Sequence, residues 1–237
     1  MRRVILALPL AIALLAPAGC VQFRTDVTID GKGGGTAKVS MSVADDVLAA
    51  RTELDKLGGD VMGLALPDYA TITRAYLEKR GAGRGVTVTQ FNKAGSGGRQ
   101  TLECTLAFTD LKGVSWALND VAAALGGSGL GLARGDGGNL VLRARQYDFP
   151  AAAKKPAPAP TGEAARRQAE LATTLIGAIG ELDISLNVTV PGDIVRSNAP
   201  QVSGRTSTWV INAGNMMNQQ DVNPEIVFSG AGLAIKP

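Results

Sequence analysis

The sequence predicts an α+β fold: an antiparallel β-sheet with several helices packed on one face of it. Three observations support this class. Short segments in which apolar and polar residues alternate, typical of half-buried strands, recur along the whole chain. Segments with apolar residues three and four positions apart, typical of amphipathic helices, lie between them. Glycine-rich stretches, which favour turns, separate many of these segments.

Residues 1–19 have the features of an export signal. A basic start (MRR) precedes an apolar stretch, Val4–Leu15, and small residues then lead into Cys20. The apolar stretch is too short to span a bilayer, which takes about 20 residues. The pattern resembles the lipobox of bacterial lipoproteins, which implies that Cys20 is acylated and becomes the N-terminus. The alternative is an ordinary signal peptide that is cleaved near Ala18 and leaves Cys20 free.

The lipobox resemblance also implies a location. Two or three acyl chains on one cysteine hold a protein stably in a membrane. The residue after Cys20 is Val21 and not Asp, which by the sorting habit of such lipoproteins implies the outer membrane if the organism has one. We therefore expect residues 20–237 to form an exported domain, anchored to the membrane of the cell envelope by its N-terminal lipid.

The composition excludes several kinds of site. Two of the 24 Lys and Arg residues lie in the leader, which leaves 22 basic against 21 acidic residues, so the charge does not indicate nucleic-acid binding. The chain has no histidine, which excludes Ser-His-Asp and Cys-His active sites and every His-ligated metal site. We expect no catalytic residue, no cofactor and no metal. Alternation in TLECTLAF predicts that the second cysteine, Cys104, is a buried core residue.

The first half of the mature chain begins with a β-hairpin over residues 21–43, because alternating segments flank the turn sequence DGKGGG. A helix is expected over residues 45–66, since Asp45 and Asp46 favour a helix N-terminus and an apolar stripe follows. Gly58-Gly59 is expected to kink or split this helix. The segments that follow are predicted as a helix from Asp68, strands over 86–91 and around Cys104, a helix over 114–125, a loop over 126–138 that can hold a short strand, and a strand over 139–147.

The second half begins after PAAAKKPAPAPTG (150–162), whose Pro/Ala composition predicts an extended linker. We expect this linker to interrupt one folded domain; two domains divided at the linker are the alternative. An amphipathic helix follows over residues 163–182. The chain is then expected to close with strands over 183–190, 205–212 and 225–230.

One late segment, SLNVTVPGDIVRSNAPQVSGRTSTWVI, resembles the closing strands of the LppM-type family of bacterial lipoprotein domains, which is related to the DUF3153 group. The shared pattern is a hydrophobic strand followed by Pro191-Gly192, then Ser197-Asn198, Gly204 and Thr206–Trp209. The lipobox Cys running directly into a strand fits the same family. The resemblance implies association with the cell envelope and the binding of lipids or glycolipids.

The chemistry of these residues is structural. Pro191 ends a strand and Gly192 permits a turn. Asn198 can close a local turn through its side chain, and Trp209 with Ile211 is expected to face the core. These residues mark a fold and do not form a catalytic set.

We therefore expect a non-enzymatic envelope lipoprotein that binds a lipid or another amphiphile in an apolar cleft. Residues of the helices over 47–66 and 171–182 would line the cleft, although a closed core explains the same residues. The alternative is a structural or assembly protein that binds another envelope protein through exposed sheet edges. An enzyme would depend on carboxylates such as Asp45/Asp46 and Glu53/Asp55, which helix ends and solvated helix faces also explain.

Overall fold

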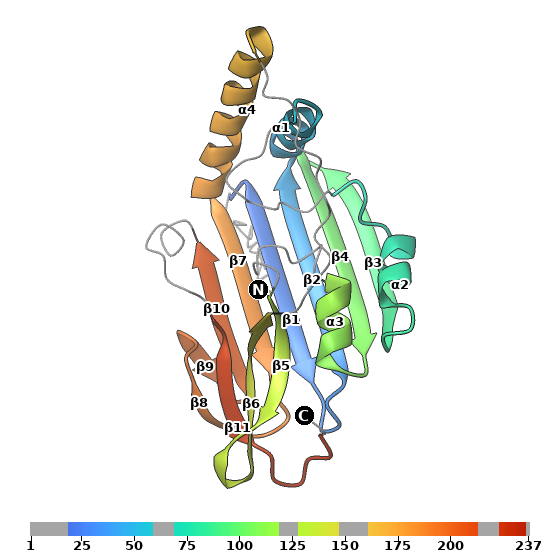
Figure 1. Cartoon of the computed structure of the whole chain (residues 1–237), viewed down its shortest axis with the longest axis vertical. Coiled ribbons are helices and arrows are strands. Elements are labelled where there is room, and N and C mark those ends of the chain that lie inside the picture. Colours follow the sequence, from blue (N-terminus) through green and yellow to red (C-terminus); the bar gives the residue numbers. More distant parts are fainter. Residues whose placement is uncertain (1–18, 59–68, 119–127, 147–160, 213–222, 236–237) are drawn as a thin grey trace, which may run out of the picture.

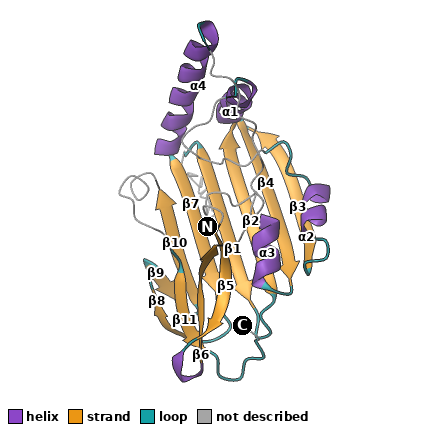
Figure 2. Ribbon diagram, viewed as in Figure 1, coloured by secondary structure: helices purple, strands orange, loops and turns teal. Residues whose placement is uncertain are grey.

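The computed structural model describes residues 19–58, 69–118, 128–146, 161–212 and 223–235 (Figure 1). Over these ranges the chain forms four α-helices and two β-sheets, which confirms the predicted α+β class (Figure 2). No cis peptide bond occurs in the described part.

Seven strands form the larger sheet, in the order β3-β4-β2-β1-β7-β10-β9. Neighbouring strands are antiparallel except β1 and β7, which are parallel. The first strand of the domain therefore pairs with a strand that lies far later in the chain. The strands are β1 (Val21–Ile29), β2 (Gly35–Ala44), β3 (Val86–Ser96), β4 (Arg99–Phe108), β7 (Leu182–Thr189), β9 (Gln201–Ser203) and β10 (Thr206–Asn212).

Four shorter strands form a second, antiparallel sheet in the order β5-β6-β11-β8. In Figure 1 it lies in front of the lower part of β1, β7 and β10. The strand periodicities in the sequence do not reveal this second sheet, because they do not say which strands pair. Its strands are β5 (Ser128–Arg134), β6 (Asn139–Gln146), β8 (Ile194–Ser197) and β11 (Glu225–Ser229).

The helices lie in two places. α2 (Arg74–Gly81) and α3 (Leu111–Leu118) contact each other and pack near β3 and β4. α1 (Asp45–Lys56) and α4 (Glu163–Gly180) pack against each other at the end of the sheet where β2 ends and β7 begins (Figure 1). A short 3-10 turn, Asp136–Gly138, joins β5 to β6.

The core lies between the larger sheet and the layer formed by the second sheet and the helices. Alternate residues of the long strands point into it, and Val39, Leu106 and Val188 are completely buried. Ile226 and Phe228 of β11 are also completely buried, so the second sheet contributes to the same core. Cys104 is 1% exposed, which confirms its prediction as a core residue.

The opposite face of the larger sheet is polar, and we call it the polar face. Because side chains alternate along each strand, residues paired across strands form rows on this face. One row crosses six strands, another contains five threonines, and both consist of partly or fully exposed side chains. The first row is Thr208, Asn187, Asp26, Lys38, Thr105 and Gln90.

One predicted helix boundary is wrong, and the described residues cover only part of another predicted helix. The helix predicted from Asp68 begins only at Arg74, because the hydroxyl of Thr73 accepts a hydrogen bond from the backbone N–H of Tyr76 and caps it there. The first helix begins at Asp45 as predicted and ends at Lys56, with Gly58 at φ +69°. Residues 59–66 of that predicted helix and residues 150–160 of the predicted linker lie outside the described ranges.

In the segment that follows β7, Gly192 has a packing role besides the predicted turn, and Asn198 has a different role from the predicted one. Gly192 is needed for close packing, because a Cβ there would lie 2.0 Å from the carbonyl oxygen of Ser229. Asn198 does not close a local turn; its side chain joins three separate segments. Its Oδ1 accepts hydrogen bonds from the indole N–H of Trp209 (3.2 Å) and the backbone N–H of Glu225 (2.9 Å), and its Nδ2 donates to the carbonyl of Asn223 (2.7 Å).

Candidate functional site

Cys20 lies at the end of the larger sheet where α1 begins and α4 ends. The next residue, Val21, is the first residue of β1 and pairs with Val43 of β2 and Leu182 of β7. The carbonyl of Cys20 accepts a hydrogen bond from the backbone N–H of Ala44 at 2.9 Å. Cys20 is therefore fixed to the folded domain by its own backbone, while its side chain remains partly exposed.

The thiol of Cys20 faces an acidic side chain. Its Sγ donates a hydrogen bond to Oε2 of Glu181 at 2.9 Å. This hydrogen bond raises the pKa of the Cys20 thiol, and partial burial together with the negative charges of Glu181 and Asp46 raises it further. Because a thiolate is the reactive form of cysteine, the folded chain does not activate Cys20 as a nucleophile.

Gly19, immediately before Cys20, lies against the start of β7. A Cβ at this position would lie 2.6 Å from the carbonyl oxygen of Glu181. Glycine is therefore the residue that fits here without displacing the backbone of Glu181. Cleavage before Cys20 would leave the new N-terminus beside Glu181.

The two helices beside Cys20 are joined by an ion pair. Arg167 of α4 donates from Nε and Nη2 to both carboxylate oxygens of Glu53 on α1, at 2.7 and 2.8 Å. The Arg167 guanidinium lowers the pKa of the Glu53 carboxyl. Buried Val47, Ala50 and Leu54 of α1 meet the apolar side of α4, which includes Leu171 and Leu175.

This packing bears on the predicted apolar cleft. The two predicted lining helices contact each other, and their described apolar residues named above are at most 5% exposed. These named apolar residues therefore belong to the closed core, the alternative that the sequence left open. Residues 59–66, the rest of the first predicted lining segment, lie outside the described ranges.

The polar face carries a hydrogen-bonded network over β10, β7 and β1. The hydroxyl of Thr208 donates to Oδ1 of Asn187 at 2.7 Å, and Nδ2 of Asn187 donates to Oδ1 of Asp26 at 2.6 Å. Arg24 also donates from Nε to both carboxylate oxygens of Asp26, at 3.1 and 3.0 Å. Asp26 therefore forms an ion pair with Arg24 and accepts a hydrogen bond from Asn187, and is not an isolated acid.

The same row of residues leads into a recess of about 370 Å³ near the edge of the sheet. A β-bulge in β3, between Val88 and Gln90, bends the edge strand there. Arg74 of α2 donates from Nη2 to the carbonyl of Val88 at 2.9 Å, and so fixes α2 beside the bulge. The recess is lined by Lys38, Arg74, Gln90, Phe91, Asn92, Glu103 and Thr105.

The recess presents hydrogen-bonding groups of both kinds. Lys38 and Arg74 supply cationic donors, Glu103 supplies an anionic acceptor, and Gln90 accepts from the hydroxyl of Thr105 at 3.2 Å. Phe91 is the one apolar side chain in the lining. Such a surface suits a small polar or charged group and does not suit an acyl chain, which would leave these polar groups without water or partners.

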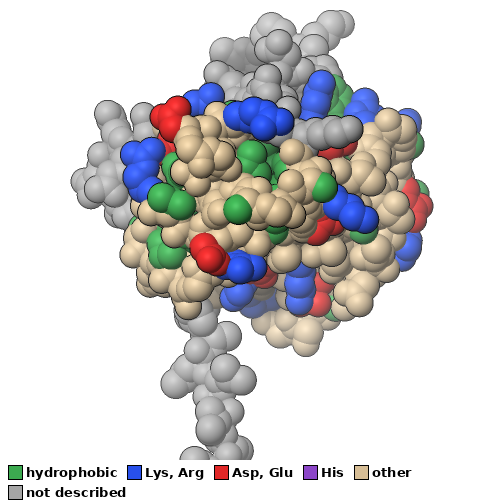
Figure 3. Space-filling model, turned by 90° about the horizontal axis from the view of Figure 1, so that it is seen from below, with side chains coloured by type: hydrophobic (Ala, Val, Ile, Leu, Met, Phe, Trp, Pro, Cys, Tyr) green, Lys and Arg blue, Asp and Glu red, His purple; other side chains and the backbone are tan. Residues whose placement is uncertain are grey.

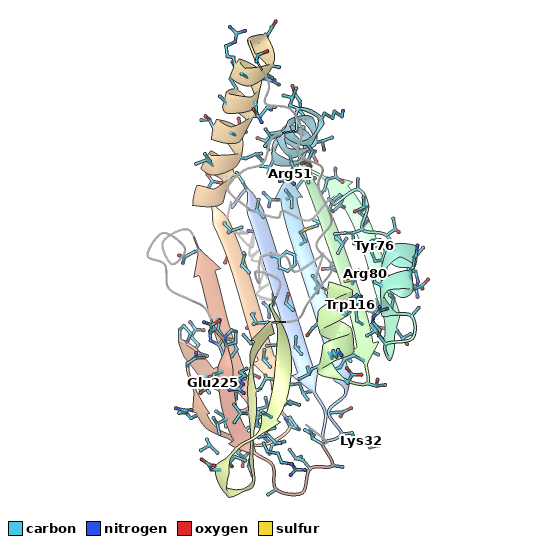
Figure 4. All side chains as sticks on the ribbon, in the orientation of Figure 1. Lys32, Arg51, Tyr76, Arg80, Trp116 and Glu225 are labelled. Carbon is cyan, nitrogen blue, oxygen red and sulfur yellow. The ribbon has the colours of Figure 1, made fainter. Side chains whose placement is uncertain are left out.

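A further cluster of residues, which the sequence analysis missed, joins α2 to α3. The guanidinium carbons of Arg80 and Arg84 lie 5.3 and 4.6 Å from the centre of the Trp116 ring. Arg80 also donates from Nη2 to the carbonyl of Trp116 at 3.2 Å. Figure 4 shows Arg80 and Trp116 side by side between the two helices. No local signal in the sequence indicates this cluster, because Trp116 lies more than 30 residues after Arg80 and Arg84.

The carboxylates that an enzyme would have used serve structural purposes. Asp45 and Asp46 begin α1, and Asp45 accepts a hydrogen bond from the side chain of Gln100 at 2.8 Å. Asp55 forms an ion pair with Arg51 at 3.0 Å, and Glu53 pairs with Arg167 as described. Among the described residues, no three Cys, Asp or Glu side chains cluster as metal ligands would.

The part of the chain that the structure describes contains no helix that is both long enough and apolar enough to cross a membrane.

No family model matches the sequence, and no curated protein matches it. Solved structures do match the fold. One of them is the NMR structure of the folded domain of the LppM protein from Mycobacterium tuberculosis, with a TM-score of 0.44. The alignment covers 92% of this chain and 94% of that chain, at 14% sequence identity.

Proposed function

We propose that this chain is a lipid-anchored protein of the bacterial envelope, held to its membrane through Cys20. The observation that carries the proposal is the position of Cys20: it ends the export signal and is partly exposed where the folded domain begins. An acyl group on its sulfur can extend from the domain into the membrane without disturbing the core. The second cysteine cannot serve this purpose, because Cys104 is 1% exposed.

The experiment compares membrane attachment of the full chain with that of two variants. We expect the full chain to sediment with membranes and its intact mass to include a diacylglyceryl group on Cys20. Cys20→Ser should release a folded domain, because no other anchor is proposed. Cys104→Ala is the matched control and should stay attached. A Cys20→Ser chain that remains in membranes after a high-salt wash, or an intact mass with a free thiol at Cys20, would show that the proposal is wrong.

We propose further that the anchored domain binds an amphiphile, without catalysis. The recess on the polar face supports this, since its charged and amide groups can bind a polar head group. The same purified protein tests it: native mass spectrometry of the full chain, extracted in mild detergent, should show a stoichiometric extra mass that fragments as a lipid. A spectrum without bound lipid would contradict amphiphile binding.

A second candidate function is the binding of another envelope protein. One observation favours it: Val195 on β8 and Val202 on β9 are 62% and 49% exposed, on edge strands of the two sheets. Exposed edge strands can pair with a strand of a partner. A protein that co-purifies with the full chain and is lost in Val195→Lys and Val202→Lys, while the lipid mass is absent, would favour this function.

A further inference from the structure

The anchor that we propose has almost no linker, and this inference rests on that proposal. Val21 directly follows Cys20, is 4% exposed and is paired on both sides within the sheet. The backbone of Cys20 is itself bonded to Ala44. An acylated Cys20 therefore cannot move away from the domain on a flexible tether. The surface around Cys20 must lie close to the bilayer.

The sulfur of Cys20 lies beside the C-terminal end of α4. Glu181, which follows α4 directly, accepts the hydrogen bond from the Cys20 thiol at 2.9 Å. Upstream of Glu181, residues 171–180 contain no charged side chain. At 1.5 Å per residue they provide about 15 Å of uncharged helix that leads away from the anchor.

The uncharged segment has one buried side and one exposed side. Leu171, Leu175 and Ala178 are at most 5% exposed. Ile176 points the other way and is 50% exposed, although it lies only about 8 Å along the helix from the residue that contacts Cys20. Small or uncharged residues share the exposed side with it: Thr173, Thr174, Gly177 and Gly180.

The opposite end of the molecule has a different surface. Figure 3, which views the molecule from below, shows side chains of both charge signs scattered among polar groups, with hydrophobic side chains in small groups. Val202, also half exposed, belongs to β9, which Figure 1 places in the lower half of the molecule, away from α4. Among the described residues, Ile176, Val195 and Val202 are the exposed large hydrophobic side chains. Only Ile176 belongs to the helix beside the proposed anchor.

We propose that the exposed side of residues 171–180 of α4, centred on Ile176, rests on the surface of the bilayer that holds the Cys20 lipid. Contact with lipid removes the apolar side chain of Ile176 from water, and the uncharged segment adds no cost of charge desolvation. The acyl anchor and this helix side then hold the domain at two points. Together they fix its orientation on the membrane.

The test measures how close single positions come to the lipid. The full, acylated chain is reconstituted into phosphatidylcholine vesicles after Ile176→Cys or, as the matched control, Val202→Cys, each labelled with a fluorophore. The native cysteines do not interfere, because Cys20 is acylated and Cys104 is buried. Both substituted side chains are about half exposed, so both variants should unfold at the temperature of the unsubstituted chain.

We expect brominated phosphatidylcholine to quench the label at position 176 several-fold more strongly than the label at position 202. Iodide in the water should show the reverse preference. Equal quenching at the two positions, in vesicles that float with the protein, would overturn this inference and leave the anchor proposal standing. A chain that does not float with the vesicles would overturn both, since the inference rests on the anchor.

Discussion

The side chain of Asn198 is predicted to stabilise the junction between the two sheets. It accepts hydrogen bonds from the indole N–H of Trp209 in β10 and from the backbone N–H of Glu225 in β11, and it donates one to the carbonyl of Asn223. Asn198→Ala removes all three hydrogen bonds at once.

The cost follows from the burial of the partners. Trp209 is 3% exposed, so its indole N–H would lose its partner without access to water, which costs about 1–3 kcal/mol. The other two hydrogen bonds lie near the surface and contribute about 0.5 kcal/mol each. We therefore expect Asn198→Ala to lower the free energy of unfolding by about 2–4 kcal/mol.

The assay is urea unfolding of the mature domain with Cys20→Ser, with a double-mutant cycle against Trp209→Phe. The cycle should give a coupling energy of about 1 kcal/mol. Trp209→Phe keeps a six-membered aromatic ring in the core and removes the pyrrole part of the indole with its N–H donor. Asn198→Asp keeps an oxygen that accepts from Trp209 and Glu225 and loses the donor to Asn223, so it should cost less than Asn198→Ala. A loss below about 0.5 kcal/mol for Asn198→Ala, or strict additivity in the cycle, would refute the reasoning.

Two further predictions concern the larger sheet. Gly35→Ala should lower the free energy of unfolding, measured in urea, by about 3 kcal/mol or more, because Gly35 has φ +155° and a Cβ would lie 1.9 Å from the carbonyl oxygen of Thr28. Gly83→Ala is the control: Gly83 has φ +71° and open space around it, so the loss should be only about 1 kcal/mol. Burial raises the pKa of the Cys104 thiol from 9.0 to about 11, so above pH 9 the unfolded chain loses a proton that the folded chain keeps. Stability should therefore fall between pH 9 and 11, and Cys104→Ala should remove that part of the decline. An unchanged pH profile in the variant, or equal losses for the two glycines, would count against these arguments.

The sequence predicts most strands well, because burial on one side of a sheet imposes alternation. β1, β2 and the Cys104 strand are examples in which every second residue is buried. The same alternation does not say which strands pair. The parallel pairing of β1 with β7 and the pairing of β11 with β6 depend on contacts between residues more than 80 positions apart.

The candidate site shows the same division. Cys20, the proposed anchor, is recognisable from its own neighbours in the sequence, because a basic start, an apolar stretch and small residues precede it. Its hydrogen-bond partner Glu181 is 161 residues away and has no local signal. The recess likewise takes Lys38 from β2, Glu103 from β4 and Arg74 from α2, and only the strand register and the β3 bulge place them together.

The anchor and the recess can be tested separately, because they share no residue and lie well apart. Asp26, in the row that leads to the recess, comes six residues after Cys20 along β1, a distance of about 20 Å. Lys38, its partner on β2, is a lining residue of the recess. A Cys20→Ser chain released from the membrane should therefore keep the recess, the proposed head-group site, intact. If the extra lipid mass persists in that chain, the lipid is bound by the domain; if it disappears with the anchor, it was lipid held beside Cys20.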